Sequence, residues 1–205
     1  ERIARGDLKR LIVNMPPRHS KSEFASYLMP SWFLGRNPKL KIIQATMNTE
    51  LAVRFGRKVR DLIADPLYRE IFPNTDLKPD SQAAGRWETS AGGEYFAAGV
   101  GAAMTGRGAD LLIIDDPHSE QDALSSTAYD NAWEWYTSGP RQRLQPGGSI
   151  IIVQTRWSKK DITGRLLQAQ QKDLMADQWD VVEFPAIMPS GEPLWPEFWK
   201  KDELL

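Results

Sequence analysis

Residues 11–22 read Leu-Ile-Val-Asn-Met-Pro-Pro-Arg-His-Ser-Lys-Ser, so a short apolar run passes directly into a basic loop. This order predicts a buried strand, followed by a loop and a helix whose first backbone N–H groups face an anion. The sequence meets the phosphate-loop pattern GxxxxGK(S/T) only in part, because Met15 and Ser20 stand in place of its two glycines. If the loop needs a positive φ at Ser20, a serine there costs about 1 kcal/mol or more. Other motifs in the chain are needed to show whether this loop binds phosphate.

The basic side chains of the loop suit a phosphate ligand. In a phosphate loop the lysine reaches the β- and γ-phosphates and the next hydroxyl binds Mg²⁺, and these two roles fit Lys21 and Ser22. Arg18 adds a charge that can bind two phosphate oxygens at once. The alternative is a solvated basic turn, but a helix N-terminus repels cations unless an anion offsets them. The candidate phosphate-binding residues are Pro17, Arg18, His19, Ser20, Lys21 and Ser22.

Two adjacent carboxylates follow a second apolar run, in Leu-Leu-Ile-Ile-Asp-Asp-Pro at residues 111–117. They would lie at the carboxyl edge of a sheet, where α/β proteins bind ligands. A strand-end Asp holds Mg²⁺ in phosphate-loop nucleotidases, which suits Asp115, and a neighbouring carboxylate can orient or deprotonate water, which suits Asp116. A strand that simply ends in an Asp-Pro turn is the alternative. Together with Lys21 and Ser22, the pair favours a Mg-nucleotide site.

Two further segments carry candidate residues. Gly99–Gly108 contains four glycines and Arg107, which could reach a γ-phosphate of its own subunit or of a neighbour, or could belong to a flexible connector. The run Ile150–Val153 ends in Gln154 and Thr155, which could sense the γ-phosphate or could cap the next helix. Both alternatives stay open in each case.

The order of apolar runs predicts an α/β fold. Continuous apolar blocks indicate strands buried on both faces of a mostly parallel sheet, and helix-like segments between them indicate helices on both sides. The strands are expected at 11–14, 41–45, 109–114, 149–155 and 179–184, and the helices at 21–34, 51–63, 126–138 and 159–172. Asn48 or Thr49 is expected to cap the second helix, and Asp65-Pro66 to end it. Residues 86–89 and 94–97 flank Ala-Gly-Gly and predict a β-hairpin inserted in this series.

Composition narrows the function classes. The 205 residues have a formal charge of −1, which argues against a protein that coats nucleic acid through bulk charge. The absence of cysteine excludes disulfides and thiol catalysis, and two histidines, His19 and His118, argue against a histidine-rich metal site. The apolar runs are too short to span a bilayer, so no membrane partner is expected. Because the chain begins at Glu1 and not at methionine, we expect a fragment.

These motifs, in this order, resemble the large terminase subunit of tailed bacteriophages, the ATPase of the genome-packaging motor. The quoted stretches are Met-Pro-Pro-Arg-His-Ser-Lys-Ser, Thr-Gly-Arg-Gly-Ala-Asp-Leu-Leu-Ile-Ile-Asp-Asp-Pro, Ile-Ile-Val-Gln-Thr-Arg-Trp and Leu-Trp-Pro-Glu. They are similar to that family's phosphate loop, its Mg-binding strand with a preceding Arg loop, its coupling motif and the approach to its nuclease domain. Ser20 stands where that family usually has a second glycine, and Asp116 where a glutamate is more frequent.

The resemblance implies a three-layer phosphate-loop ATPase of the additional-strand, RecA-like type over residues 1–184. The proline-rich residues 185–205 would then be a linker toward a nuclease domain that this chain does not contain. It implies ATP and Mg²⁺ as cofactors, with Arg18, Lys21 and Ser22 at the phosphates, Asp115 at the metal and Asp116 as catalytic carboxylate. Arg107 would act in trans, and Gln154 and Thr155 would contact the nucleotide and couple hydrolysis to movement.

The implied partners are double-stranded DNA, the viral portal, the small terminase subunit and further copies of the chain in a ring, with a monomer as the alternative state in isolation. The implied location is the host cytoplasm and, transiently, the viral procapsid. Two other functions stay open on sequence grounds. One is a helicase-like or remodelling ATPase, and the other is a non-catalytic interaction module with a degenerate phosphate loop.

Overall fold

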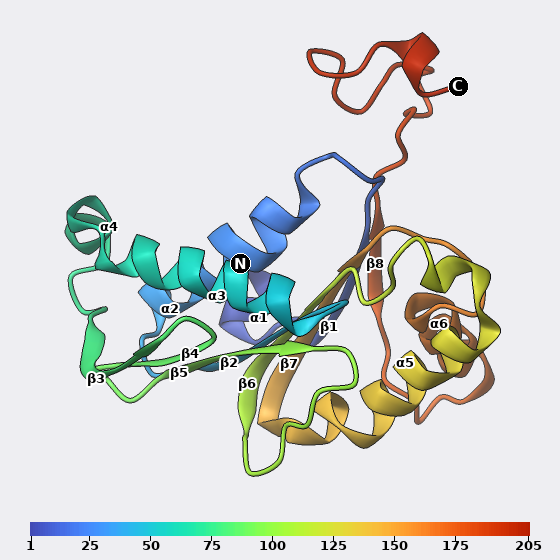
Figure 1. The fold of residues 1–205 in the computed structure, drawn as a ribbon. Helices are drawn as coiled ribbons and strands as arrows, with labels where there is room; N and C mark the ends of the chain where they lie inside the picture. The colour runs from blue at the N-terminus through green and yellow to red at the C-terminus, as the bar shows by residue number, and fades with distance from the viewer.

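One eight-stranded sheet runs through the centre of the computed structural model, which describes residues 1–205 (Figure 1). The strand order is β3-β4-β5-β2-β6-β7-β1-β8, and five of the seven pairings are parallel. The strands are β1 (Arg10–Asn14), β2 (Lys41–Thr46), β3 (Leu77–Ala83), β4 (Arg86–Thr89), β5 (Glu94–Gly99), β6 (Ala109–Asp115), β7 (Leu144–Gln154) and β8 (Asp180–Glu183). The mixed α/β fold with a mostly parallel sheet agrees with the prediction from the apolar runs.

Helices cover both faces of the sheet (Figure 1). On one face, α2 (Met29–Arg36) and α3 (Thr49–Ala64) pack in a core that includes Leu111 and Ile113 of β6. On the other face, α5 (Ser126–Ser138) and α6 (Ile162–Lys172) pack in a second core that includes Leu112 and Ile114. Because successive side chains of a strand point to opposite faces, and both faces of β6 are covered, β6 needs apolar residues at all four positions from 111 to 114.

Capping residues set the helix boundaries. The Asn48 side chain accepts a hydrogen bond from the Leu51 N–H at 2.9 Å and begins α3, which ends before Asp65, as expected. Helix α6 begins three residues later than expected, because buried Asp161 is its N-cap and accepts the Gly164 N–H at 2.7 Å. The capping side chain thus fixes the first residue of a helix, which the apolar repeat alone does not determine.

The helix after the phosphate-loop-like segment has an unusual first part. Glu23–Leu28 form a π-helix, η1, and α2 continues it from Met29. Pro30 lies in the first turn of α2, where proline is tolerated, so the helix type changes here and the chain continues as a helix. The wider turn of η1 directs Ala25 and Ser26 into the interior.

The expected hairpin is present in a different form. Strands β4 and β5 pair antiparallel, but β5 also pairs parallel with β2, so it is an integral strand of the main sheet and not part of an insertion. β3 extends this edge, pairing antiparallel with β4, and was not predicted because its sequence is mostly polar and contains Pro79. Short helices α1 (Arg2–Arg5) and α4 (Pro66–Ile71) were also not predicted.

Residues 185–205 continue beyond the carboxyl end of β8, outside the layers formed by the sheet and the helices (Figure 1). Their regular structure is limited to a bridge between Ile187 and Pro193 and the short helix η4 (Lys201–Glu203). Two other short helices, η2 (Asp122–Leu124) and η3 (Pro140–Arg143), lie earlier in the chain. No helix of the chain has the length and apolar character needed to cross a lipid bilayer.

Candidate functional site

Three adjacent parallel strands bring the predicted site residues to one edge of the sheet. In the order β6-β7-β1, Asp115 is the last residue of β6, Gln154 is the last residue of β7, and the basic loop follows β1. The carboxyl ends of parallel strands meet at the same edge, which is where ligands of α/β proteins bind. Segments almost 140 residues apart in sequence therefore form one group.

The basic loop has two residues in the left-handed region of the backbone. Ser20 has φ 61°, as expected for the position where the pattern has glycine, and Arg18 has φ 57°. Each costs about 1 kcal/mol or more for a residue with a side chain, so the surrounding structure must hold the loop in this shape. Between them, the buried His19 ring lies 2.8 Å by its Nδ1 from the Pro17 carbonyl oxygen and stacks on Trp199 of the C-terminal segment, with ring centroids 6.0 Å apart.

Lys21 is buried, with only 7% of its surface exposed, and its ammonium group lies 2.8 Å from Oδ2 of Asp116. The other carboxylate oxygen of Asp116, Oδ1, accepts a hydrogen bond from the Thr155 N–H at 2.8 Å. Asp116 also has a positive φ of 43°, in the left-handed region of the backbone. A single carboxylate therefore joins the basic loop, the end of β6 and the segment after β7.

Asp115 lies deeper, with 1% of its surface exposed. Its Oδ2 accepts a hydrogen bond of 2.6 Å from the Ser26 hydroxyl, while Oδ1 is buried without a hydrogen-bond partner. Burial raises the pKa of Asp115 to about 6, with a contribution from the Asp116 charge, and the Ser26 and Ser22 hydroxyls and Lys21 act in the opposite direction. Asp115 is therefore ionised at neutral pH and presents a charged oxygen.

The residues at this point fit a magnesium ion. Mg²⁺ prefers oxygen ligands and is usually bound by one or two protein groups, with water and phosphate oxygens completing the shell. Oδ1 of Asp115 is a charged oxygen without a partner, and the Ser22 hydroxyl is close enough to lower the pKa of the same carboxyl. Asp115 and Ser22 could hold the ion together with phosphates bound to the loop.

The end of β7 supplies polar groups without partners. Gln154 is 1% exposed, and both its amide oxygen and its amide nitrogen lack hydrogen-bond partners. Its register neighbour on β1 is Asn14, which donates from Nδ2 to Glu183 at 2.9 Å and has an unpaired Oδ1. A buried amide with free donors and acceptors can bind water or a ligand oxygen at this edge.

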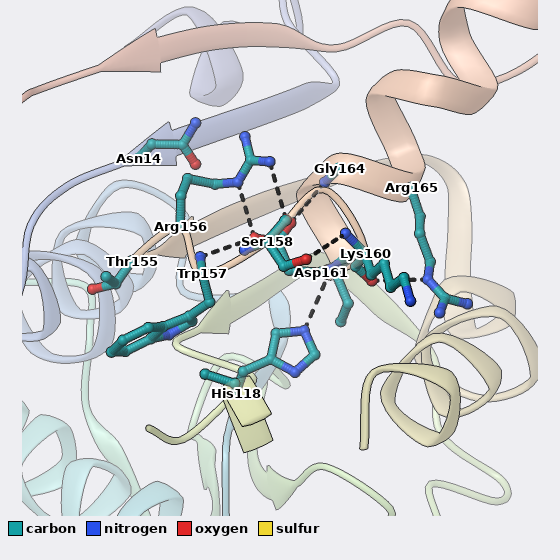
Figure 2. A network of polar contacts seen from close by, with 12 residues as sticks. Asn14, His118, Thr155, Arg156, Trp157, Ser158, Lys160, Asp161, Gly164 and Arg165 are labelled. Atoms are coloured by element: carbon teal, nitrogen blue, oxygen red, sulfur yellow. Dashed lines mark hydrogen bonds and ion pairs between the residues drawn. The ribbon is translucent and has the colours of Figure 1, made fainter. Parts of the chain in front are cut away.

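A network around Asp161 fixes the segment that follows β7 (Figure 2). The fully buried carboxylate accepts hydrogen bonds from the Arg156 guanidinium at 3.0 Å and from the Trp157 and Ser158 N–H groups at 3.2 and 3.3 Å. His118, two residues after Asp116, accepts the Ile162 N–H at Nε2 at 3.3 Å. Burial lowers the pKa of His118, which keeps the ring neutral and able to accept. The 116–118 segment thus binds the loop between β7 and α6 at both ends.

Arg107 lies away from the other predicted site residues. It precedes β6, so it is at the amino edge of the sheet, where its guanidinium pairs with Glu94 of β5 and lies 3.9 Å from the Phe96 ring centroid. The seven residues of β6 separate this edge from Asp115, a length of about 20 Å at the usual rise per residue. The structure brings Lys21, Ser22, Asp115, Asp116, Gln154 and Thr155 together, but it does not bring Arg107 to them. Arg18 is exposed beside the group.

Four residues around the site were not identified from the sequence: Ser26, Gln44, His118 and Asp161. The Asp161 side chain had a usable signal, because an Asp before an apolar helix repeat is a common N-cap. His118 could have been considered because it follows Asp116 by two residues. Ser26 and Gln44 gave no signal, since a single polar residue in a helix or a strand is most often at the surface.

The layered α/β fold, with its mostly parallel sheet, is shared with a terminase of known structure. Comparison with solved structures finds the crystal structure of the HK97 bacteriophage large terminase, with a TM-score of 0.52 and 14% sequence identity. The match covers 89% of this chain and 36% of that chain, so this chain spans about a third of the length of that terminase. The similarity expected from the motifs is confirmed at the level of the fold. No family model and no curated protein matches the sequence.

Proposed function

We propose that the chain is the ATP-hydrolysing domain of a viral large terminase, which drives double-stranded DNA into a procapsid. The observation that carries the proposal is the meeting of Lys21, Asp115 and Asp116 at one edge of the sheet, with Lys21 2.8 Å from Asp116. β7 lies between β1 and β6, which supports a phosphate-loop ATPase of the additional-strand, RecA-like type. The terminase-like fold supports the same function class.

Each residue of the site would have its own role in ATP hydrolysis. Lys21 and Arg18 would bind the β- and γ-phosphates and stabilise the charge that develops on the transferred phosphoryl group. Ser22 and Asp115 would hold Mg²⁺, which neutralises phosphate charge. Asp116 would orient the attacking water or accept its proton, and its contact with Lys21 keeps that carboxylate beside the γ-phosphate position.

Thr155 and Gln154 would connect the nucleotide to the rest of the chain. The Thr155 N–H binds the carboxylate that we assign to the attacking water, so a shift of Asp116 during hydrolysis would reach the segment after β7. Asp161 and His118 hold that segment against α6. This path leads from the phosphate to a helix on the surface of the domain.

Arg107 would act on the nucleotide of a neighbouring subunit. In its own chain it lies at the opposite edge of the sheet, and its ion pair with Glu94 holds it there. A role in trans implies a ring of copies around DNA, assembled on the portal together with the small terminase subunit. Such a ring would work in the host cytoplasm, on the procapsid, and the isolated monomer would turn over ATP slowly.

The proposal is tested by titrating the purified chain with ATP and Mg²⁺ and by measuring phosphate release. We expect Lys21→Ala to abolish hydrolysis and to weaken nucleotide binding. Lys172→Ala is the matched control, because Lys172 is an exposed lysine of α6. Nucleotide binding that is equal in the wild type and in Lys21→Ala would contradict the assignment of the loop.

A further inference from the structure

A line of three buried polar side chains ends at Asp115. The Gln44 amide donates from Nε2 to the Ser26 hydroxyl oxygen at 2.8 Å, and the Ser26 hydroxyl donates to Oδ2 of Asp115 at 2.6 Å. Ser26 and Gln44 are both fully buried. The line crosses three elements, since Gln44 lies on β2, Ser26 on η1 and Asp115 at the end of β6.

The chemistry of these groups fixes the direction of the hydrogen bonds. A serine hydroxyl has one proton, and an ionised carboxylate can only accept. Ser26 must therefore give its proton to Asp115, and its oxygen is left to accept from the amide nitrogen of Gln44. The line has one consistent arrangement, in which each donor points toward the carboxylate.

Burying these polar side chains in the interior costs free energy, which suggests that they are retained for a function. Ser26 and Gln44 lie among the apolar side chains of the interior, next to Ala25 and opposite Ile113 in the sheet register. A buried polar group costs free energy unless it is hydrogen-bonded, and apolar residues of similar size would fill this space without that cost. The π-helical turn that directs Ser26 inward is also rare and is often found at functional sites.

The consequence for Asp115 is a fixed orientation. With Oδ2 held by Ser26, the carboxylate cannot rotate freely, and Oδ1 remains the oxygen without a partner. Hydrogen bonds behind a metal ligand typically set its orientation and its affinity for the ion. We propose that Ser26 and Gln44 are positioning residues, which hold Asp115 so that Oδ1 faces the divalent cation. This inference rests on the proposed function of the site.

The test measures cation binding directly. Mn²⁺ replaces Mg²⁺ as the probe, and its binding to the chain in the presence of ADP is followed by electron paramagnetic resonance. We expect Ser26→Ala to weaken Mn²⁺ binding by about tenfold and Gln44→Met to weaken it less, because Gln44 acts through Ser26. Ser26→Thr retains the hydroxyl and should bind Mn²⁺ nearly as well as the wild type.

Ser31→Ala is the matched control. Ser31 is a buried serine of the adjoining helix, and its hydroxyl donates to the Tyr27 carbonyl at 2.6 Å, away from Asp115. It should lower the melting temperature without changing Mn²⁺ affinity. If Ser26→Ala also lowers only the melting temperature, the positioning role is wrong.

Further variants separate this inference from the proposed function. If Asp115→Asn and Lys21→Ala lose Mn-ADP binding while Ser26→Ala and Gln44→Met keep it, the site is correct and the positioning role fails. If the wild type does not bind Mn-ADP, or if Asp115→Asn binds it as well as the wild type, both proposals fail. Gln44→Met retains a long side chain in the interior, so it keeps the test informative if Ser26→Ala does not fold.

Discussion

The buried charge of Asp115 has a cost that can be measured by removing it. We expect Asp115→Asn to abolish hydrolysis and, at the same time, to stabilise the fold above pH 6. Asparagine has nearly the same shape as aspartate, and its side-chain oxygen can still accept the hydrogen bond from Ser26. The substitution therefore removes mainly the charge.

The magnitude follows from the pKa of Asp115. A rise from 3.8 to about 6 means that the ionised carboxyl is disfavoured in the fold by about 3 kcal/mol relative to the unfolded chain. The sign is that of a raised acid pKa, so wild-type stability decreases between pH 4 and pH 6 and the full cost is present above pH 6. The attraction between Asp115 and Lys21 is already included in this pKa, so we expect a net stabilisation of about 1–3 kcal/mol.

Urea denaturation of the two proteins at pH 7.5, 6 and 4.5 measures this difference. The stabilisation should be largest at pH 7.5 and should become small at pH 4.5, where the wild-type carboxyl is protonated as well. Asp202→Asn is the control for net charge, since Asp202 is exposed in the C-terminal segment. A loss of stability in Asp115→Asn at pH 7.5, or a gain that is the same at every pH, would show that the buried charge does not destabilise the fold.

Three further predictions concern the surrounding groups. Binding of Mg-ATP, measured by calorimetry, should weaken as the pH falls through about 6, because protonated Asp115 loses the charge that attracts the cation; constant affinity from pH 7.5 to pH 5 would contradict this. His118→Phe should destabilise the chain by about 1–3 kcal/mol, because it leaves the buried Ile162 N–H without an acceptor, whereas His118→Gln supplies one and should recover most of the loss in urea denaturation. Arg107→Ala should reduce ATP turnover of the assembled ring by about 10³-fold while the ATP affinity of the monomer stays unchanged; an unaffected turnover rate would exclude Arg107 as the trans-acting group.

The main features of the fold followed from the apolar runs. β6 is apolar at four consecutive positions, and its side chains enter two separate cores, which is why the run predicted a strand buried on both faces. Once the strands are parallel, the residues that follow them must share an edge, so the meeting of Lys21, Asp115 and Gln154 was also predictable. The pattern marked Ser20 as the position where a loop of this kind can need a positive φ, and Ser20 has one.

Other features depend on contacts that a linear pattern does not contain. β3 is polar and includes Pro79, so its pairing at the sheet edge has no periodic signal. Ser26 and Gln44 are single polar residues whose burial depends on how η1 lies on β2. The position of Arg107, in contrast, could have been inferred, because a residue before a parallel strand lies at the amino edge, away from the phosphate site.

The most direct test of the central claim is a crystal structure of the chain with Mg²⁺ and a non-hydrolysable ATP analogue. We expect phosphate oxygens within about 3 Å of Nζ of Lys21. We also expect the metal ion to be bound by the Ser22 hydroxyl and the Asp115 carboxylate, with Asp116 facing the γ-phosphate. An analogue bound away from Lys21 and Asp115 would contradict the claim that this edge of the sheet is an ATPase site.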